Sequence, residues 1–394
     1  MARIPQPVAG IRLAVRRSLA PLPADSLVLV ACSGGADSLA LAAATAFVAP
    51  RLGLRAGLLT VDHGLQPGSA ARAAEVASWG SSVGLAPAEV ATVDVGGLPG
   101  GPEAAARTAR YAALSEAASR LAAPVVLLGH TRDDQAETVL LALARGAGPR
   151  GLSGMPYRRG VFARPLLDVA RSDTRKACAA LGLAAWADPH NSDPAYARSR
   201  VRGDALPALI AALGPGVVDN LARTAAQVAV DNAALDELAA AALAASRKAR
   251  RRGGAAESGD GVAGSGSDVA LPGGAVRVEA GPSAFDAGVG AASAGGDADL
   301  SEGGAALSGD WVGPGPDGLD IRLLVGLAAA VRSRVLHMWA RELGAPGSAL
   351  SHRHVAALDA LVTDWHGQGA TQLPGDISVA RRDGMLVWAD RPDM

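Results

Sequence analysis

Between about residue 25 and residue 180, short apolar runs alternate with longer segments rich in Ala and Leu. The apolar runs predict five buried strands: Leu27–Cys32, Gly57–Val61, Val90–Val93, Val125–Gly129 and Val161–Arg164. The longer segments predict four helices: Asp37–Phe47, Ala70–Val83, Glu103–Leu121 and Asp133–Arg145. Runs that are apolar on both faces indicate strands covered by helices on both sides, so we expect an α/β fold with a doubly wound, mostly parallel sheet. Ligands of such sheets bind at the carboxyl ends of the strands.

Composition and pattern divide the whole chain into five parts. The predicted parts are an N-terminal helical extension (1–24), the α/β domain (25–215), a long helix (216–252), an acidic linker (253–320) and a small α+β C-terminal domain (321–394). In the last part we predict helices at Ile321–Leu343 and His352–Trp365. A hairpin is predicted at Ile377–Ala389, because Asp383-Gly384 is typical of a tight turn between strands.

The acidic linker decides how the net charge is interpreted. It holds 19 glycines, 11 acidic side chains and one Arg, with too little apolar surface to offset the entropy of ordering, so we expect most of it to be disordered. The whole chain carries 37 − 38 = −1, which by itself argues against a nucleic-acid partner. Without residues 253–320 the balance is 36 − 27 = +9, so the remaining chain is basic enough to bind nucleic acid.

Cysteine and lysine usage exclude several function classes. Cys32 and Cys178 are 146 positions apart, so neither a zinc motif nor a disulfide framework is present. Neither Lys176 nor Lys248 precedes Ser or Thr, which excludes a Walker A nucleotidase. We find no secretory signal and no apolar stretch of the roughly 18–20 residues that a membrane helix needs. We therefore expect a cytoplasmic protein with no membrane partner.

The most specific motif follows the first predicted strand and opens a helix: Ser33, Gly34, Gly35, Ala36, Asp37 and Ser38. Two glycines let the backbone approach an anion, and the amides and hydroxyls at a helix start can bind phosphate. Asp37 would repel that phosphate unless Mg²⁺ or an amine is bound as well. The alternative is a glycine turn capped by Ser or Asp. The adjacent Cys32 is either a thiol nucleophile or, as we favour, a small buried residue.

Other candidates lie near the second strand and on the helix before the fourth strand. Asp62 and His63 end the second strand, where they could contact a nucleotide or substrate, although Asp62 could equally cap the turn. Arg107 and Arg110 are spaced i, i+3 on a predicted helix, so both guanidiniums can point one way and bind phosphate. The alternative for this pair is an ordinary solvated helix face.

An acidic turn follows the fourth strand, and its candidate residues are Gly129, His130, Asp133, Asp134 and Glu137. Three acids on one helical turn repel each other, and the dipole of the helix N-terminus compensates only part of that repulsion. A bound cation or a substrate ammonium would offset the rest. We therefore take the three acids as catalytic candidates and Asp37, Asp134 and Glu137 as candidate Mg²⁺ ligands; the alternative is three solvated acids.

Two basic segments complete the set of candidate residues. A Gly-rich loop, 146–154, follows Arg145 and contains Arg150; we expect it not to be helical, and its basic character suits a polyanionic substrate. The second segment offers Asn191, Tyr196, Arg198, Arg200 and Arg202. Arginines at every second position beside a tyrosine indicate a patch for a nucleic-acid backbone. An ordinary connector and a solvated face are the alternatives.

Taken in order, these motifs resemble the tRNA(Ile)-lysidine synthetases, which belong to the PP-loop ATP pyrophosphatases with their HUP-like fold. The matching segments are SGGADS (33–38), VDHGLQPGS (61–69), ARTARY (106–111), LGHTRDDQAETVLLALARGAGPRGLSGM (128–155), RPLL (164–167) and DPHNSDPAYARSRVR (188–202). The resemblance covers about residues 25–210. The acidic linker is not part of the family pattern, and Ser199 stands where many members have Asn.

The resemblance implies a two-step ligation that uses ATP and Mg²⁺. ATP adenylates the C2 carbonyl oxygen of the wobble cytidine in a CAU anticodon, and the ε-amine of free L-lysine then displaces AMP. Ser33 to Ser38 would bind pyrophosphate, and the nucleotide site would include Asp62, His63, Gly129 and His130. Arg107 and Arg110 would neutralise the intermediate. The same resemblance is compatible with a homodimer.

Three other functions remain open at this stage. A tRNA thiolase of the 2-thiocytidine type activates the same carbonyl but usually has paired cysteines, which this chain lacks. A small-molecule amide-forming PP-loop enzyme would not need the loop 146–154 or the later arginines. An RNA-binding protein without catalytic activity is disfavoured by the intact loop Ser33 to Ser38.

Overall fold

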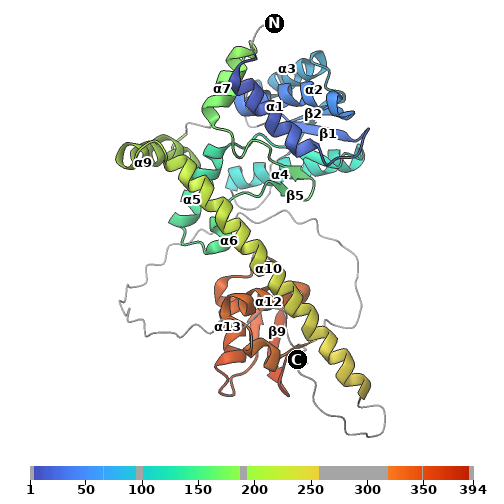
Figure 1. Ribbon diagram of the computed structural model, residues 1–394, viewed down its shortest axis with the longest axis vertical. Helices are drawn as coiled ribbons and strands as arrows, with labels where there is room; N and C mark the ends of the chain where they lie inside the picture. Colours follow the sequence, from blue (N-terminus) through green and yellow to red (C-terminus); the bar gives the residue numbers. More distant parts are fainter. Residues whose placement is uncertain are drawn as a thin grey trace. The chain divides into compact units, whose positions relative to one another are not determined.

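A computed structural model describes residues 4–64, 66–94, 101–186, 193–256, 318–347 and 349–389 of the chain. For 101–103 and 247–256 only the backbone is described. The described residues form two compact units, one ending at Glu237 and one beginning at Leu238 (Figure 1). Most of the acidic linker lies outside these residues, and so does Asn191.

The first unit is built on a six-stranded sheet in the order β3-β2-β1-β4-β6-β5. The strands are β1 (Leu27–Ala31), β2 (Arg55–Asp62), β3 (Ala88–Thr92), β4 (Val125–Leu127), β5 (Arg158–Arg159) and β6 (Phe162–Ala163). Every pair is parallel except β5 with β6. The predicted doubly wound, mostly parallel sheet is therefore confirmed. The short edge strand β5, which turns back through Gly160, was not predicted.

Strand β1 is buried on both sides, because helices cover both faces of this sheet. Val28 and Val30 pack in a core with side chains of α1 (Gln6–Leu19), α2 (Ala36–Val48), α3 (Ser69–Ser82) and α7 (Arg171–Ala180). Leu27 and Leu29 face the opposite core, which α4 (Gly101–Arg120) covers. Such two-sided burial is what a continuous apolar strand predicts. Four buried side chains of α1 (Val8, Ile11, Val15, Leu19) belong to the first core, so the N-terminal helix is part of it rather than a separate extension.

Several later elements differ from the sequence prediction. The loop 146–154 contains one helical turn, α6 (Pro149–Leu152), which begins with Pro at a position that needs no N–H donor. It follows α5 (Arg132–Ala144). Beyond α7 the chain forms α8 (Ala197–Arg200), a π-helical turn (Val201–Ala205) and α9 (Leu206–Leu213), then α10 (Val217–Ala256). The long helix therefore continues past Arg252 into the segment assigned to the linker.

The second unit contains a four-stranded antiparallel sheet in the order β7-β10-β9-β8. Its elements are β7 (Leu319–Asp320), α11 (Ile321–Val325), α12 (Ala329–Glu342), α13 (His352–Thr363), β8 (Thr371–Leu373), β9 (Ile377–Arg382) and β10 (Met385–Trp388). The predicted hairpin is confirmed, and Asp383 and Gly384 have the positive φ angles of 48° and 77° that its two-residue turn requires.

The single helix predicted over Ile321–Leu343 is wrong, because the chain breaks it into α11 and α12 around Gly326. Ala328 is extended, and the Arg332 side chain bonds both the Leu327 carbonyl and Asp359 of α13. A side chain thus supplies a hydrogen bond that the helix would otherwise make. Trp339, a residue of α12, is fully buried.

No single helix in the described parts of the chain is long and apolar enough to span a membrane. One pair of helices bent by 100°, Ala197–Leu213 and Val217–Ser246, has that length and composition only when both are counted together.

Candidate active site at the carboxyl ends of the strands

The loop from Ser33 to Gly35 joins β1 to α2 and is closed by its own hydroxyl groups. The Ser38 hydroxyl donates to the Gly35 carbonyl over 2.9 Å and accepts from the Ser33 amide over 3.2 Å. Gly34 has a φ of +82°, and a Cβ there would lie 3.0 Å from Cγ2 of Val76. Glycine at this position therefore allows both the turn and the close approach of helix α3.

The first and fourth motifs meet directly behind this loop. A Cβ on Gly129 would lie 3.1 Å from backbone atoms of Asp37 and Ser38. Only a residue without a side chain lets the end of β4 pass so close to the start of α2. The contact brings the acidic turn of α5 beside Asp37, as the common edge of parallel strands predicts.

Two acids of α5 form a buried network with three arginines. Each oxygen of the fully buried Glu137 accepts two guanidinium hydrogen bonds: Oε1 from Arg171 (2.9 Å) and Arg202 (2.8 Å), Oε2 from Arg198 (3.1 Å) and Arg202 (3.0 Å). Oδ1 of Asp134 pairs with Arg171 at 2.7 Å and with Arg202 at 3.3 Å. Burial alone would raise the pKa of Asp134, but Arg171 and other nearby cations lower it to about 2.

This network does not fit the metal role predicted for Asp134 and Glu137. The second oxygen of Asp134 accepts hydrogen bonds from the amide and hydroxyl of Thr131, so neither carboxylate has an oxygen that is not already bonded. Three guanidiniums would also repel a divalent cation at that point. Within the described ranges, no three His, Cys, Asp or Glu side chains are grouped as a metal site. Of the three predicted ligands, Asp37 alone stays a candidate.

Asp37 differs from the other two acids in its surroundings. Its carboxylate accepts a hydrogen bond from the Thr174 hydroxyl, and its Oδ2 lies 3.7 Å from Nε of Arg171. Burial raises the pKa of Asp37 despite these partners, with Asp134 adding to the rise. Asp37 is therefore held by one hydroxyl and only loosely by a guanidinium, at the start of the helix that follows the loop.

His130 is held neutral beside this network. Its Nδ1 atom is buried and has no hydrogen-bond partner among the residues described. Burial lowers the pKa of His130 to about 3, with Arg164 and Arg198 adding to the effect and Asp134 opposing it. The uncharged imidazole of His130 therefore lies at the edge of the site, close to Asp134.

The buried imidazole predicts a specific pH dependence of stability. An unfolded chain binds a proton at His130 below its ordinary pKa of 6.5, whereas the folded chain does not until about pH 3. Above pH 6.5 the free energy of unfolding therefore carries no penalty from His130. Between pH 6.5 and pH 3 it falls by at most about 1.4 kcal/mol per pH unit. Urea unfolding at several pH values gives the free energy of unfolding as a function of pH. Its slope against pH over this range should be smaller for His130→Asn than for the parent chain. Equal slopes would contradict the assignment.

The arginines predicted on α4 surround a tyrosine at the same edge. Arg107 and Arg110 lie 5.0 and 6.0 Å from the ring centre of Tyr111, whose hydroxyl accepts from Arg164 over 3.5 Å. Burial would raise the pKa of Tyr111, but Arg107, Arg164 and Arg110 outweigh burial and lower it. The direction of this shift indicates a strongly positive potential here, which suits a phosphate.

Other candidates have structural partners, and for Asp62 these give the turn-capping role that the sequence left open. Asp62 accepts from the Gly64 amide over 3.0 Å, and its hydrogen bonds, that from Ser69 first, lower its pKa, so it fixes the turn after β2 next to His63. Arg150 pairs with Asp236 of α10 at 2.7 Å. Arg145 is exposed nearby.

The patch of arginines at every second position does not form as predicted. The segment is helical, so Arg198 and Arg202 share one face and turn inward to Glu137. Arg200 instead bonds the backbone carbonyls of residues 194 and 195, while the half-buried Tyr196 precedes the helix.

Two site residues, Arg171 and Thr174, were missed in the sequence. Both lie in the first turns of α7, where Arg171 is the first helical residue and donates its backbone N–H to Asp133 over 2.8 Å. A cation at a helix N-terminus opposes the helix dipole. An arginine in this position is therefore a sequence signal: it indicates that acidic partners elsewhere in the fold stabilise Arg171.

The two thiols are buried and protonated. Burial raises the pKa of Cys32, and burial together with Asp37 raises that of Cys178 to about 11. Cys32 is 2% exposed and packs in the core behind the loop, as expected for a small buried residue.

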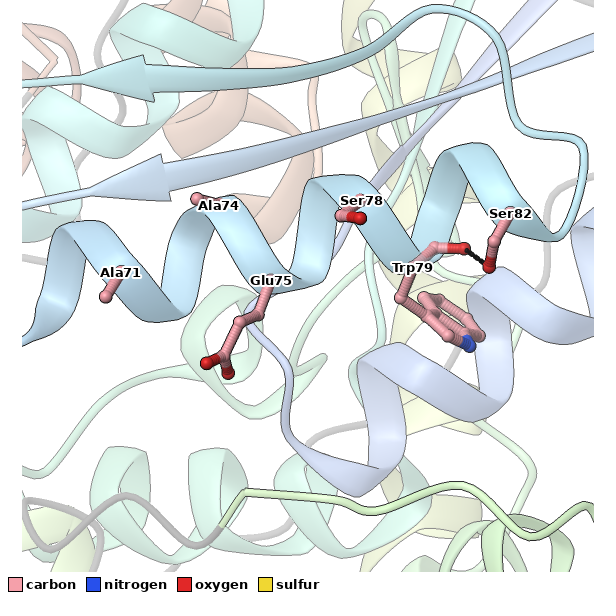
Figure 2. Close-up of a pocket in the computed structure, with 6 residues that line it drawn as sticks. All are labelled: Ala71, Ala74, Glu75, Ser78, Trp79 and Ser82. Carbon is pink, nitrogen blue, oxygen red and sulfur yellow. Dashed lines mark hydrogen bonds between the residues drawn. The ribbon is translucent and has the colours of Figure 1, made fainter.

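A hollow of about 510 Å³ lies along α3, and Glu75, Ser78 and Trp79 are among its lining residues. Figure 2 shows these side chains on α3, with the Ser82 hydroxyl donating to the Trp79 carbonyl. None of the residues that line it is a candidate site residue.

Comparison with known proteins identifies the family. Residues 12–209 match the PP-loop domain, and residues 319–387 match the TilS substrate binding domain. The chain is 57% identical to tRNA(Ile)-lysidine synthase of Salinispora arenicola over 99% of this chain and 98% of the relative. The chain belongs to the tRNA(Ile)-lysidine synthase family. The corresponding synthase of Thermobifida fusca is 47% identical over 98% of this chain and 99% of its own length.

The family assignment explains the two units. The PP-loop domain contains the six-stranded sheet and the loop 33–38, and the substrate binding domain coincides with the antiparallel sheet of the second unit. A solved structure, the U34-tRNA thiolase NcsA from Methanococcus maripaludis with its [4Fe-4S] cluster, is similar over 56% of this chain and 79% of its own, with 18% identity and a TM-score of 0.46.

Proposed function

We propose that this chain is a C–N bond-forming ligase that joins free L-lysine to C2 of the wobble cytidine in the CAU anticodon of tRNA(Ile), acting in the cytoplasm. The observation that carries the proposal is the meeting of the loop 33–38 with the acidic turn of α5 through Gly129. This meeting places the phosphate-binding loop and Asp37 beside the charged turn of α5. A carboxylate that can bind an ammonium then lies next to the phosphates. The high identity with tRNA(Ile)-lysidine synthases over the full chain supports the same reaction.

In the first step, the C2 carbonyl oxygen of cytidine attacks the α-phosphorus of ATP. A new P–O bond forms, and the bond to pyrophosphate breaks. Backbone amides of the loop 33–38 would bind the departing pyrophosphate at the start of α2. Arg107 and Arg110 would neutralise the phosphate of the adenylated cytidine, in the positive potential that lowers the pKa of Tyr111.

In the second step, Nε of lysine attacks C2, and the bond from C2 to the AMP oxygen breaks. The attacking amine must lose a proton, so a carboxylate close to the loop is needed. The oxygens of Asp134 and Glu137 are taken up by Arg171, Arg198, Arg202 and Thr131. Asp37 has a raised pKa and a looser set of partners, so we assign to it the cation of the site, either Mg²⁺ or the lysine ammonium, and the proton that Nε releases as it attacks.

The three arginines that bind Glu137, namely Arg171, Arg198 and Arg202, would then hold the elements of the site in place. Arg171 contacts Asp37, Asp134 and Glu137 together and so ties the loop helix α2 to α5 through α7. For the tRNA itself we propose contacts with Arg145, Tyr196 and Arg200, beside the inward-facing Arg198 and Arg202. Asn191 stays a prediction outside the described residues.

A thiolase reaction is the second candidate, and the cysteines argue against it. Sulfur transfer needs a thiolate or a cluster held by thiolates. Cys32 and Cys178 are buried and their pKa values are raised, so both are thiols near pH 7.

The proposal predicts that ATP cleavage depends on both other substrates. Incubation with ATP, Mg²⁺, lysine and an unmodified CAU-anticodon tRNA(Ile) should release AMP and pyrophosphate in equal amounts. Omission of lysine should limit pyrophosphate release to about one equivalent per tRNA and should release no AMP, because the AMP stays bonded to the cytidine. Omission of the tRNA should abolish the release of both. Release of ADP and phosphate instead would contradict cleavage between the α- and β-phosphates.

A further inference from the structure

Helix α3 contacts the phosphate loop through one side of its first two turns. Val76 reaches Gly34, since Cγ2 of Val76 would lie 3.0 Å from a Cβ there. Arg72 stands one turn earlier on the same face, so its side chain projects along the same edge of the loop. The arginine is half-buried, unlike its exposed neighbours Ala71 and Ala74.

A tryptophan from a distant segment completes this arrangement. The backbone amide of Trp186 donates to the Gly34 carbonyl over 3.0 Å, and the Trp186 carbonyl lies 3.9 Å from where a Cβ of Gly35 would stand. The Arg72 guanidinium carbon lies 3.5 Å from the centre of the Trp186 ring. Trp186 is thus fixed to the loop by its backbone and holds Arg72 by its ring.

Within the part of the chain that the structure describes, Arg72 has no acidic partner. Across the described residues, no carboxylate lies within ion-pair distance of its guanidinium, although Glu75 is on the next turn of the same helix. A guanidinium that stacks by one face on a ring keeps its N–H donors, which lie in its own plane, available for hydrogen bonds. Planar donors of this kind bind two oxygens of a phosphate at once.

We infer that Arg72 binds the β- and γ-phosphates of ATP, and the pyrophosphate that they become, and that Trp186 is the positioning residue that holds its guanidinium against the loop. The inference rests on the proposed cleavage of ATP at the loop 33–38. It adds to that loop a cation from α3, held by Trp186. Neither residue belongs to the motifs that point to the chemistry.

Four variants of the full-length chain test the inference: Arg72→Ala, Arg72→Lys, Trp186→Ala and Trp186→Phe. Pyrophosphate binding is measured by calorimetry without lysine and tRNA, and KM for ATP and kcat are measured in the complete reaction. Loss of a charge-assisted hydrogen bond predicts a Kd for pyrophosphate and a KM for ATP about 10- to 100-fold higher in Arg72→Ala. Arg72→Lys should recover only part of this, because an ammonium lacks the planar pair of donors.

The tryptophan variants separate positioning from packing. Trp186→Phe keeps a ring face for Arg72 and should stay within about threefold of the parent KM, whereas Trp186→Ala should approach Arg72→Ala. Arg16→Ala, an exposed arginine of α1, is the matched control and should leave both constants unchanged. An Arg72→Ala variant that keeps the parent Kd for pyrophosphate, or that loses kcat and tRNA affinity with KM for ATP unchanged, overturns the inference. A parent chain that forms no AMP would instead refute the proposed function itself.

Discussion

The Glu137→Ala variant is expected to lose about 3–5 kcal/mol of folding free energy. Glu137 is fully buried and accepts hydrogen bonds from Arg171, Arg198 and Arg202. Its removal leaves three guanidiniums close together, balanced by Asp134 and, more loosely, by Asp37. Repulsion among them, and the loss of four charge-assisted hydrogen bonds, should move the unfolding midpoint in urea far below that of the parent chain.

A surface acid provides the control for this variant. Glu116→Ala removes an exposed carboxylate from α4 and should change stability by less than about 0.5 kcal/mol. Glu137→Gln, which keeps the shape but not the charge, should fall between the two. A Glu137→Ala chain as stable as Glu116→Ala would mean that the arginines do not depend on this carboxylate, and the network would have to be reassigned.

The Asp37→Ala variant is expected to lose lysine transfer by at least about 100-fold while it keeps most of its affinity for tRNA. Asp37 lies in the first turn of α2, beside the loop, and it is not one of the residues to which we assign tRNA contacts, Arg145, Tyr196 and Arg200. Its loss removes the acid that we assign to the cation accompanying ATP. Single-turnover transfer of labelled lysine, measured beside filter binding of the same tRNA, separates the two effects.

Asp173→Ala is the matched control, because Asp173 also lies in the first turn of a helix, α7, with its side chain 42% exposed and paired with Lys176. Its transfer rate and tRNA affinity should equal those of the parent chain. A loss of tRNA affinity in Asp37→Ala as large as its loss of transfer would refute the separation of catalysis from tRNA binding.

The fold was accessible from the sequence where local pattern decides it. Residues 27–30 are apolar at every position, and burial on both faces of β1 follows directly from that run. The turn at Asp383-Gly384 was predictable for the same reason, since its geometry depends on two adjacent residues. The break near Gly326 was not, because it is stabilised by the contact of Arg332 with Asp359, 27 positions away.

The candidate site shows the same limit more clearly. Spacing placed Asp134 and Glu137 on one turn of a helix beside the loop, and that placement is correct. It could not reveal that Arg171, Arg198 and Arg202, 34 to 68 positions along the chain, already occupy their oxygens. Ion pairs between distant segments leave no periodic trace in a single sequence, so spacing alone favoured a metal role that these arginine-bonded oxygens do not fit.

The most direct test of the account is transfer of radiolabelled lysine to an unmodified CAU-anticodon tRNA(Ile) in the presence of ATP and Mg²⁺. The account predicts label in the wobble nucleotide, one equivalent per tRNA, with AMP formed in equal amount. A tRNA with another base at the wobble position should take up none. Sulfur incorporation at that cytidine without lysine, or no modification by the intact chain, would contradict the central claim.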